Sequence, residues 1–374
     1  MKTHILHVID SLAIGGAERM LVEIANQTNR TQFKVSVCVT RADTTLASEL
    51  KPHIQVFVLN RKNRFDIKGI KRFAALLKQK NVDILHVHGR SSFAFTVFAT
   101  LLCLINPTVI LHDHRSIEIE ASIPTWFRIW GKQRLDCYIA VYQRLVAWAR
   151  AAGIRFSKIN VIENALDLTR ILRAKCFDIK KHLKIPEDTL VGLFVGGLRR
   201  EKGLDILIKA VSKSRYHKKA KFIVVGSIQN EPYVQACKEA IEKCGLGDTI
   251  LFLGPRKEVP SILKSVDFAV LPSISESGPL VLIEYMASGL PFVASRVGAI
   301  SLRADELGVP GFVPPNDAEA FSKALDEILG LSSADRASRG AIGREIAFRY
   351  FDIRKKMPQW YQVYNRVLHK EHWH

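Results

Sequence analysis

Short apolar runs alternate with amphipathic stretches along the whole chain, and this alternation constrains the fold more than any other feature. Apolar, β-branched runs bounded by turn residues are typical of buried parallel strands, and the amphipathic stretches are typical of helices that cover them. Strands are predicted at His4–Ile9, Lys34–Val39, Gln55–Leu59, Ile84–Val87, Val109–Leu111 and Cys137–Val141, and, after Val161-Ile162, at Val191–Val195, Lys221–Val225, Ile250–Leu253, Phe268–Leu271 and Pro291–Ala294. The fold class is therefore α/β, with two doubly wound, Rossmann-like domains.

The chain has 374 residues, which exceeds the roughly 250–300 at which one hydrophobic core stops growing. Weak periodicity and alternating charge over residues 165–185 mark a linker between the two halves. We expect one Rossmann-like domain over residues 1–168 and a second over residues 169–352. A helix over about residues 353–374 is expected to pack back on the first domain.

Charge and targeting features restrict the partners and the compartment. The 55 Lys and Arg residues outnumber the 36 Asp and Glu residues, which predicts a polyanionic partner: nucleic acid, an anionic bilayer or a phosphorylated small molecule. Six cysteines without a CxxC pair favour reduced thiols and a cytoplasmic location. The N-terminal apolar run is too short for a secretory signal, and Phe93–Ile105 is too short to span a membrane.

The segment from Leu271 to Pro291 carries the strongest chemical signal. A strand ends at Leu271, Pro279 suits the first turn of a helix, and a glycine and a proline end that helix. In an open α/β sheet, ligands bind at the carboxyl ends of strands, where a helix N-terminus can hold phosphate. Glu276 and Glu284 would repel phosphate, so we expect them to accept hydrogen bonds from sugar or ribose hydroxyls. The alternative is that Glu276 caps the helix and Glu284 lies on a solvated face.

This segment resembles the signature of the retaining GT-B glycosyltransferases of glycosyltransferase family 4, also called glycosyl transferases group 1, a large group that includes bacterial glycan and lipopolysaccharide enzymes. In that signature, two glutamates separated by seven residues lie in a segment like E-G-x-P-L-V-L-x-E-A-M-A-x-G-x-P. Ser277 replaces the usual glycine, and Tyr285 replaces the usual alanine. The resemblance extends over nearly the whole chain.

The resemblance implies a role for each residue of the motif. Glu276 would contact the hydroxyls of the donor sugar, and Glu284 would contact the ribose of the nucleotide. Backbone N–H groups near Gly278 and Leu280 would bind the diphosphate.

A second motif, Phe194–Asp205, resembles the family's V-G-R-L-x-x-E-K-G-x-D, whose arginine and lysine bind the diphosphate. Lys202 is in register with that lysine, but Gly197 stands where the arginine is expected. Arg199 or Arg200 is a candidate replacement, because a guanidinium can pair bidentately with phosphate. The alternative is that this basic run is a solvated helix start.

Near the N-terminus, Gly15 and Gly16 follow the first predicted strand and resemble the family's glycine-rich loop, which lets the backbone approach the donor or the acceptor. A plain tight turn explains the pair equally well. The loop is not the G-x-G-x-x-G fingerprint of dinucleotide-binding enzymes.

Two predicted strands, within Asp83–His88 and Val109–His114, each end with two histidines. We expect both strand ends to point into a cleft between the domains. The resemblance assigns His114 to the reacting sugar carbon, with His112 behind it. Asp113 should point to the opposite face of the strand, so His112, Asp113 and His114 do not suit one metal site.

No metal and no cofactor are expected, and the nucleotide-diphosphate sugar is the co-substrate. The D-x-D motif of metal-dependent GT-A enzymes is absent from the sequence. Lysine or arginine would stabilise the departing diphosphate instead.

The resulting expectation is transfer of a sugar from a nucleotide-diphosphate sugar to a glycan or lipid-linked acceptor, in the synthesis of cell-surface polysaccharide or lipopolysaccharide. One alternative is a nucleotide-sugar epimerase of the same fold. The other is a basic nucleic-acid-binding protein, which predicts a concentrated basic stripe, whereas lysine and arginine are spread over both halves. Nucleic acid is therefore not expected as a partner.

Basic residues mixed with tryptophan suit the surface of an anionic bilayer. They occur at Arg61, Lys62, Arg64, Lys68, Lys71, Arg72, Lys78 and Lys80, and again at Trp126, Arg128, Trp130, Lys132 and Arg134. Peripheral contact with the inner face of the cytoplasmic membrane is one interpretation. A solvated helix face is the other.

Overall fold

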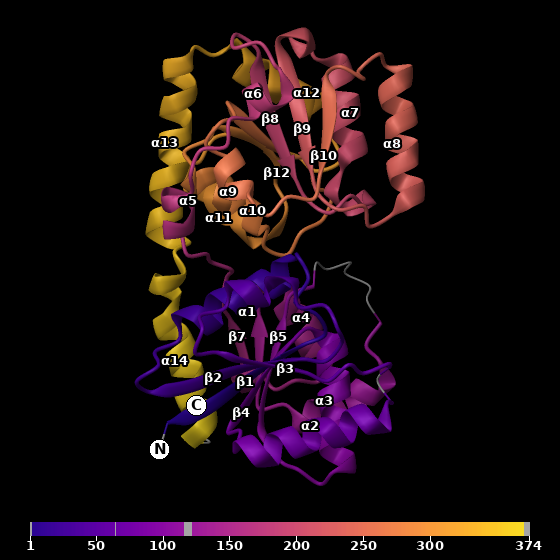
Figure 1. The fold of residues 1–374 in the computed structure, drawn as a ribbon, viewed down its shortest axis with the longest axis vertical. Coiled ribbons are helices and arrows are strands. Elements are labelled where there is room, and N and C mark those ends of the chain that lie inside the picture. The colour runs from indigo at the N-terminus through magenta and orange to yellow at the C-terminus, as the bar shows by residue number, and fades with distance from the viewer. Residues whose placement is uncertain (1, 64, 116–121, 370–374) are drawn as a thin grey trace. The chain divides into compact units, whose positions relative to one another are not determined.

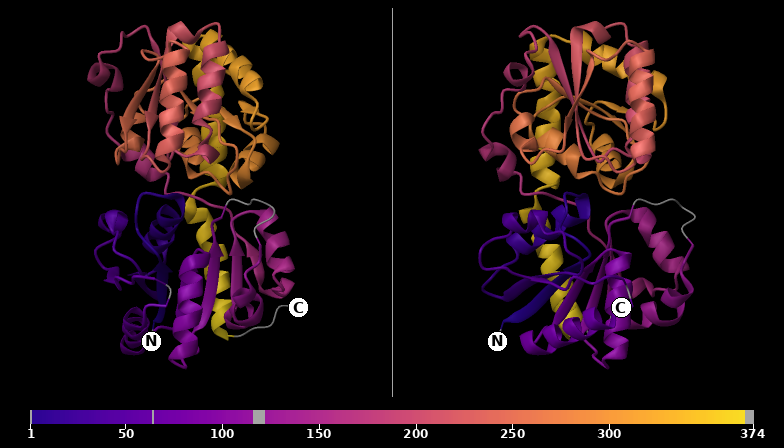
Figure 2. Two further views of the ribbon diagram at one scale, coloured as in Figure 1. Left: turned by 90° about the vertical axis from the view of Figure 1, so that its right-hand side faces the viewer. Right: turned by 45° about the vertical axis from the view of Figure 1, so that its right-hand side comes forward.

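The computed structural model describes residues 2–63, 65–115 and 122–369 (Figure 1). The chain divides into two compact units: Met1–Leu166 with Ile353–His374, called unit 1 here, and Asp167–Asp352, called unit 2. Each unit contains one parallel sheet with helices on both faces (Figure 2). The prediction of two doubly wound α/β domains is confirmed.

Unit 1 is built on a seven-stranded parallel sheet with the strand order β3-β2-β1-β4-β5-β6-β7. The strands are β1 (Thr3–Ile9), β2 (Phe33–Val39), β3 (Gln55–Val58), β4 (Ile84–His88), β5 (Thr108–Asp113), β6 (Cys137–Ala140) and β7 (Ile159–Val161). Every residue of β4 is buried, including His86 and His88, as expected for a central strand of a parallel sheet that is covered on both faces.

The helices of unit 1 connect these strands. They are α1 (Gly16–Gln27), α2 (Ile67–Lys80), α3 (Arg90–Leu102), α4 (Gln143–Ala151) and α14 (Ile353–His369), with short turns η1 (Thr45–Glu49), η2 (Phe127–Gly131), η3 (Lys132–Arg134) and η4 (Phe156–Lys158). At the start of α2, the side chain of Asp66 accepts from the N–H of Gly69, and Asn81 ends the helix at a φ of 48°.

The C-terminal helix α14 belongs to unit 1, although it lies far away in sequence. It begins where the N–H of Ile353 donates to the carbonyl of Leu166 over 2.9 Å, and its apolar face packs against α1. Trp360 and Tyr364 are fully buried on that face. The predicted helical period of this segment therefore reflects a buried stripe.

Unit 2 is built on a six-stranded parallel sheet with the order β10-β9-β8-β11-β12-β13. Its strands are β8 (Leu190–Val195), β9 (Ala220–Val225), β10 (Ile250–Gly254), β11 (Phe268–Leu271), β12 (Phe292–Ser295) and β13 (Phe312–Val313). Its helices are α5 (Thr169–Arg173), α6 (Ile179–Leu183), η5 (Arg200–Lys202), α7 (Leu204–Lys213), η6 (His217–Lys219), α8 (Glu231–Lys243), α9 (Val259–Ile262), α10 (Leu280–Ala287), α11 (Gly298–Glu306), α12 (Ala318–Gly330) and α13 (Ser333–Tyr350).

The segment predicted as a linker, residues 165–185, contains two short helices, α5 and α6. Asp178 caps α6 by accepting from the N–H of Lys181. Helices this short show no recognisable hydrophobic period, because they complete little more than one turn.

No helix in the described part of the chain has the length and apolar character needed to cross a membrane. The apolar run Phe93–Ile105 lies mostly in α3 and its C-terminal turn. Three of the six thiols are buried, those of Cys38, Cys137 and Cys237, whereas Cys176 and Cys244 are exposed.

Candidate functional site

The loop between β11 and α10 carries most of the candidate residues. It leaves the sheet after Leu271 and enters α10 at Leu280. Pro279 lies directly before the helix, with φ −67° and ψ 107°, rather than in its first turn as predicted. Gly289, at a φ of 73°, follows the end of α10, as expected for a left-handed position after a helix.

Glu276 is held by two donors. Its Oε1 accepts from the Nζ of Lys202 over 2.5 Å and from the Oγ of Ser273 over 2.8 Å. The side chains of Glu276 and Lys202 are only 10% and 17% exposed. The pair neutralises the carboxylate that would otherwise repel phosphate, and it fixes the direction of both side chains.

The turn that carries Lys202 rests directly on the loop after β11. Gly203 has a φ of 68°, and a Cβ there would lie 2.0 Å from the carbonyl oxygen of Pro272. The N–H of Ile274 donates to the carbonyl of Glu201 over 2.8 Å. Only glycine satisfies both the left-handed backbone and this close approach.

Glu284 lies in the second turn of α10, and its side chain is 14% exposed, so it is not on a solvated face. Its Oε1 is 3.6 Å from the Nη2 of Arg170. The neighbouring Tyr285 attaches α10 to the sheet, because its hydroxyl accepts from the N–H of Val195 over 3.0 Å and donates to the carbonyl of Val270 over 3.4 Å. Tyrosine in place of the usual alanine therefore adds hydrogen bonds that connect α10 to β8 and β11.

Gln229 occupies the space beside Gly197. A Cβ at Gly197 would lie 2.5 Å from atoms of the Gln229 side chain. The Nη1 of Arg199 donates to the Oε1 of Gln229 over 3.3 Å, and its Nε is 3.6 Å from Glu201. Arg199 is therefore held next to the position where the family arginine would begin.

The start of α11 also contacts the loop that carries Glu276. Gly298 has a φ of 78°, and a Cβ there would lie 3.0 Å from the carbonyl oxygens of Glu276 and Ser277. The N–H of Ala299 donates to the carbonyl of Ser277 over 2.7 Å. Unit 2 thus brings Lys202, Glu276, Gly278, Leu280 and Glu284 to one edge of its sheet.

In unit 1, Gly15 and Gly16 lie at the start of α1, after β1. A Cβ at Gly15 would lie 2.3 Å from the Oε2 of Glu18, so glycine lets this carboxylate fold back over the turn. Burial raises the pKa of Glu18. A Cβ at Gly16 would meet no described atom within 4 Å.

His114 follows β5 at the carboxyl edge of the same sheet and is half-buried. Burial lowers its pKa to about 4. Asp113 lies on the opposite face, where it accepts from the Nε of Arg90 and the hydroxyl of Tyr138, each over 2.7 Å.

The expectation that the histidine pairs end their strands in an open cleft is wrong for three of the four residues. His86, His88 and His112 are at most 2% exposed and lie inside unit 1. Trp360 of α14 packs against two of them, with ring centroids 5.3 Å from His86 and 4.9 Å from His112.

Several supporting residues were missed from the sequence. Ser273, Arg170 and Gln229 support the unit 2 site from positions that no motif marks. His7 also lies beside the other histidines of unit 1. It is on β1, which pairs with β4, the strand that carries His86 and His88, and this placement was the available signal.

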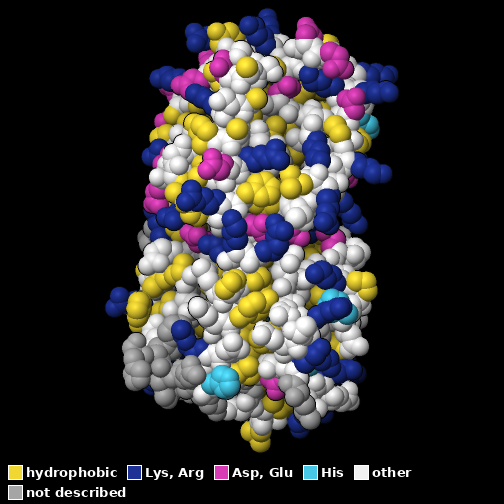
Figure 3. Space-filling model, turned by 90° about the vertical axis from the view of Figure 1, so that its left-hand side faces the viewer, with side chains coloured by type: hydrophobic (Ala, Val, Ile, Leu, Met, Phe, Trp, Pro, Cys, Tyr) yellow, Lys and Arg dark blue, Asp and Glu magenta, His cyan; other side chains and the backbone are white. Residues whose placement is uncertain are grey.

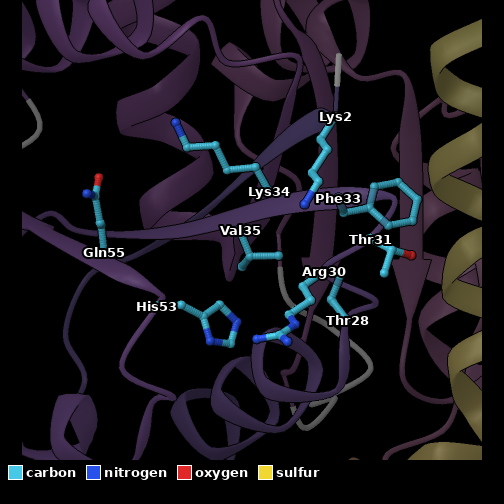
Figure 4. A pocket seen from close by; sticks show the side chains of 9 residues that line it. All are labelled: Lys2, Thr28, Arg30, Thr31, Phe33, Lys34, Val35, His53 and Gln55. Atoms are coloured by element: carbon cyan, nitrogen blue, oxygen red, sulfur yellow. The ribbon is translucent and has the colours of Figure 1, made fainter.

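The pocket in Figure 4 lies at the amino ends of the first three strands, whereas Gly15 and His114 follow strand carboxyl ends. Its lining residues are Lys2, Thr28, Arg30, Thr31, Phe33, Lys34, Val35, His53 and Gln55. It contains none of the predicted site residues.

Two Rossmann-like α/β units in one chain are the architecture of the GT-B class. Residues 14–170 match the family described as Glycosyltransferase Family 4, and residues 177–345 match Glycosyl transferases group 1. The chain therefore belongs to glycosyltransferase family 4, and it is a glycosyltransferase.

Two curated relatives extend over most of the chain. N-acetyl-alpha-D-glucosaminyl L-malate synthase of Bacillus anthracis is 24% identical over 81% of this chain and 80% of its own length. An Escherichia coli UDP-Gal:alpha-D-GlcNAc-diphosphoundecaprenol alpha-1,3-galactosyltransferase is 24% identical over 94% of this chain and 96% of its own length.

Solved structures agree on the fold. The Anabaena protein HepE, in complex with UDP and glucose, has a TM-score of 0.80 at 22% identity and covers 97% of this chain and 99% of its own. WaaG, a glycosyltransferase involved in lipopolysaccharide biosynthesis, has a TM-score of 0.70 at 14% identity, over 94% of this chain and 98% of its own.

Proposed function

We propose that this glycosyltransferase moves a sugar from a nucleotide-diphosphate sugar to a glycan or lipid-linked acceptor, with retention of the anomeric configuration and without a metal ion. The observation that carries the proposal is the Lys202–Glu276 pair beside the start of α10, with Glu284 on the same helix. Unit 2 supplies the donor site in this proposal, and unit 1 supplies the acceptor side and His114.

The diphosphate lies at the N-terminus of α10 in this proposal. The first N–H groups of an α-helix have no partner within the helix, and the helix dipole favours negative charge there. Backbone groups near Gly278 and Leu280 therefore suit the phosphate oxygens. Lys202 and Arg199 or Arg200 add the positive charge that a divalent ion supplies in metal-dependent enzymes.

The two carboxylates recognise hydroxyl groups. Glu276 already receives Lys202 and Ser273 on Oε1, so its direction is set before a sugar binds. Glu284 is similarly positioned beside Arg170 and is assigned to the ribose. The family resemblance supplies these two roles and the retaining outcome.

The relatives suggest where to begin the search for substrates. The HepE structure is a complex with UDP and glucose, and the E. coli relative is named as acting on a diphosphoundecaprenol-linked sugar. A UDP-sugar and a polyprenyl-diphosphate-linked glycan are therefore the first donor and acceptor to test. Both choices fit a role in the synthesis of cell-surface polysaccharide or lipopolysaccharide.

A lipid-linked acceptor requires access to a bilayer, and we propose that unit 1 contacts an anionic membrane on its cytoplasmic face. Phe65, Phe98 and Trp126 form a continuous aromatic group, with centroid distances of 5.4 and 6.1 Å. Phe65 and Trp130 are 61% and 45% exposed. Aromatic residues beside lysine and arginine suit a bilayer interface.

Not all of the basic residues singled out in the sequence belong to that surface. Lys68, Lys71 and Arg128 are exposed. Arg61, in contrast, is buried, and its Nη2 lies 2.5 Å from Asp10. Arg64 lies outside the described residues.

A transfer assay in excess EDTA tests the proposed reaction. The purified protein is given UDP-sugars and lipid-linked glycan acceptors, nucleoside diphosphate release is followed, and the anomeric configuration of the product is read by NMR. We expect an α-linked product from an α-linked donor. The substitution Glu276→Gln should lower kcat by roughly 100- to 1,000-fold, in the range found for lost transition-state contacts.

Glu239→Gln, an exposed glutamate on α8, is the matched control and should leave the rate unchanged. An inverted product, or activity that disappears with EDTA and returns with a divalent ion, would contradict the proposal.

A further inference from the structure

The pocket of Figure 4, at the amino edge of the unit 1 sheet, concentrates positive charge. Its volume is about 740 Å³, within the roughly 300–1,000 Å³ of small-molecule sites. Lys2, Arg30 and Lys34 line it, and His53 adds its ring nitrogens. None of the described lining residues is acidic. Asp83, at the same edge of the sheet, is engaged in a backbone hydrogen bond and does not line the pocket.

The four basic side chains come from four separate segments. Lys2 precedes β1, Arg30 lies between α1 and β2, Lys34 is within β2, and His53 precedes β3. In the view of Figure 4, Arg30 and His53 lie on one side of Val35, and the two lysines lie on the other. The positive charge therefore extends along the pocket and suits a ligand that is charged at more than one place.

The fold itself does not use these cations. Elsewhere in unit 1, the buried guanidinium of Arg61 is paired with Asp10. Among the described residues, in contrast, no carboxylate forms an ion pair with Lys2, Arg30 or Lys34. Like charges that gather without a counterion repel one another, so an anion bound between them would stabilise the folded protein.

The hydroxyl groups of the pocket offer little to a neutral ligand. Thr28 donates its hydroxyl hydrogen to the carbonyl of Ile24 over 2.7 Å, and Thr31 donates to the Oδ1 of Asn29 over 2.8 Å. Each hydroxyl has only one hydrogen to donate. The ligand must therefore take its hydrogen bonds mainly from cations, and phosphate groups, with their charge and strong acceptor oxygens, suit this best.

The floor of the pocket is apolar and held in place. Phe33 and Val35 are only 4% and 8% exposed. The Phe33 ring stacks on Tyr361 of α14, with centroids 5.7 Å apart and planes 15° apart. The hydroxyl of Tyr361 also accepts from the N–H of Asn29 over 3.0 Å, directly before Arg30. The pocket is therefore formed before a ligand arrives, which lowers the entropic cost of binding.

The same floor separates two sources of phosphate, a dissolved compound and a lipid headgroup. Surfaces that bind a bilayer insert exposed apolar side chains into it. The large apolar side chains of the pocket, Phe33 and Val35, are buried, whereas Phe65 and Trp130, which are exposed, belong to other segments. The pocket therefore suits a dissolved ligand.

The pocket is also separate from the edge of the sheet that carries Gly15 and His114. Strand β1 extends over the seven residues Thr3–Ile9, so the two edges are about 20 Å apart at roughly 3.3 Å per residue. A compound in the pocket therefore does not take the place of the sugar or of the acceptor.

We propose that this pocket binds a dissolved compound with two or more phosphate groups. One phosphate lies between Arg30 and His53, another lies near Lys2 and Lys34, and the rest of the compound lies on the apolar floor. The site depends neither on sugar transfer nor on the nucleotide site proposed for unit 2.

Calorimetric titration of the full chain with inorganic pyrophosphate tests this proposal. We expect two sites in the unmodified protein: the pocket, and the proposed diphosphate site of unit 2. The double substitution Arg30→Gln with Lys34→Gln should weaken the first by at least about tenfold, since each lost charged hydrogen bond has about that effect. Arg30→Lys with Lys34→Arg keeps both charges and should retain it. Lys202→Gln should weaken only the second.

Hydrogen–deuterium exchange locates the site. Pyrophosphate should slow exchange in residues 28–35 of the unmodified protein and of Lys202→Gln, but not in Arg30→Gln with Lys34→Gln. Both substituted side chains are exposed, so the melting temperature without ligand should be unchanged. That measurement separates lost binding from lost folding.

Arg150→Gln with Lys243→Gln is the matched control, because it removes the same charge from exposed positions outside the pocket. Both pyrophosphate sites should persist in it. An equal loss in the control would show that only net charge matters and would overturn the proposal. So would binding to phosphatidic acid vesicles that depends on Arg30 and Lys34 while pyrophosphate binding does not.

The two sites can fail separately. A single pyrophosphate site that is lost in Lys202→Gln would reject the pocket and leave the proposed function intact. A single site that is lost in Arg30→Gln with Lys34→Gln would support the pocket and count against the proposed diphosphate site of unit 2.

Discussion

The proposed donor site depends most directly on Lys202 and Glu276. Exposed ion pairs contribute about 0–1 kcal/mol, but this pair is mostly buried and receives a further hydrogen bond from Ser273. Its side chains are therefore oriented before a ligand arrives. Removing one partner leaves the other charge poorly solvated, so single substitutions affect both stability and binding.

Arg199 is the better candidate for the missing family arginine, because Gln229 holds it beside Gly197. We predict that Arg199→Ala weakens binding of a nucleoside diphosphate by roughly 10- to 100-fold, the equivalent of about 1.5–3 kcal/mol for a charged hydrogen bond. Arg200→Ala should change it by less than about threefold.

Calorimetric titration with the nucleoside diphosphate and with the nucleoside separates these contributions. Affinity for the nucleoside should be the same in both variants. A larger loss of nucleoside diphosphate affinity in Arg200→Ala than in Arg199→Ala would assign diphosphate binding to Arg200.

At the scale of single elements, the contact of the η5 turn with the loop after β11 can be tested at one glycine. We predict that Gly203→Ala lowers the free energy of unfolding by roughly 2–4 kcal/mol, because a Cβ would collide with the carbonyl of Pro272 and the φ is 68°. Urea denaturation measures the change.

Gly245 is the matched control, since its φ is 64° and a Cβ there would meet no described atom within 4 Å. Gly245→Ala should therefore show only the backbone strain of about 1–2 kcal/mol. Equal effects of the two substitutions would mean that the close approach at Gly203 is unimportant.

The buried histidines of β1, β4 and β5 predict a pH dependence of stability. Burial lowers the pKa of His7 to about 3 and that of His114 to about 4. It also lowers the pKa values of His86, His88 and His112 well below the usual 6.5. The unfolded chain therefore binds more protons than the folded chain between about pH 4 and 6.5. Stability should be lost as the pH falls through that window and should be level with respect to these groups above it.

Each histidine that stays neutral adds a slope of about 1.4 kcal/mol per pH unit. Chemical denaturation at intervals from pH 4.5 to 8 measures this slope, and His86→Phe should reduce it by the contribution of one group. A free energy of unfolding that does not change between pH 4.5 and 6.5 would contradict the burial of the cluster.

The sequence was sufficient to predict the elements in which apolar residues recur regularly. It was insufficient to predict the elements that lack such a pattern. All strands except β7 (Ile159–Val161) and β13 (Phe312–Val313), together with α14, were predicted within a few residues, because burial imposes a period on them. The helices α5 and α6 were missed, since five residues show no period. The burial of His86 and His112 depends on Trp360, which is more than 200 residues away in sequence, so no local pattern revealed it.

For the whole molecule, the net charge of +19 raises the question of which polyanion it meets. On the face shown in Figure 3, lysine and arginine side chains are scattered among acidic and hydrophobic ones rather than gathered in a stripe. A phosphate-bearing donor and an anionic bilayer both suit such a distribution.

We predict that neutralising Lys68, Lys71 and Arg128 of unit 1 to glutamine weakens binding to vesicles containing phosphatidylglycerol. Each basic residue near an anionic surface contributes about 1 kcal/mol, so the combined loss is on the order of 100-fold. Vesicle co-sedimentation at low and high salt measures it.

The control neutralises three exposed lysines of unit 2, Lys218, Lys219 and Lys243. This change removes the same charge and should leave vesicle binding nearly intact. Equal losses in the two variants would show that only net charge matters, and the membrane-facing role of unit 1 would be rejected.

The most direct test of the central claim is thermal stabilisation by UDP-, GDP-, ADP- and TDP-sugars in EDTA, measured on the unmodified protein, on Glu284→Ala and on Glu239→Ala. A ligand at about 100 times its Kd adds about 2.7 kcal/mol to the folded state. We predict that one nucleotide class stabilises the unmodified protein and Glu239→Ala but not Glu284→Ala. Stabilisation by no nucleotide sugar, or an unchanged response in Glu284→Ala, would contradict the proposed donor site.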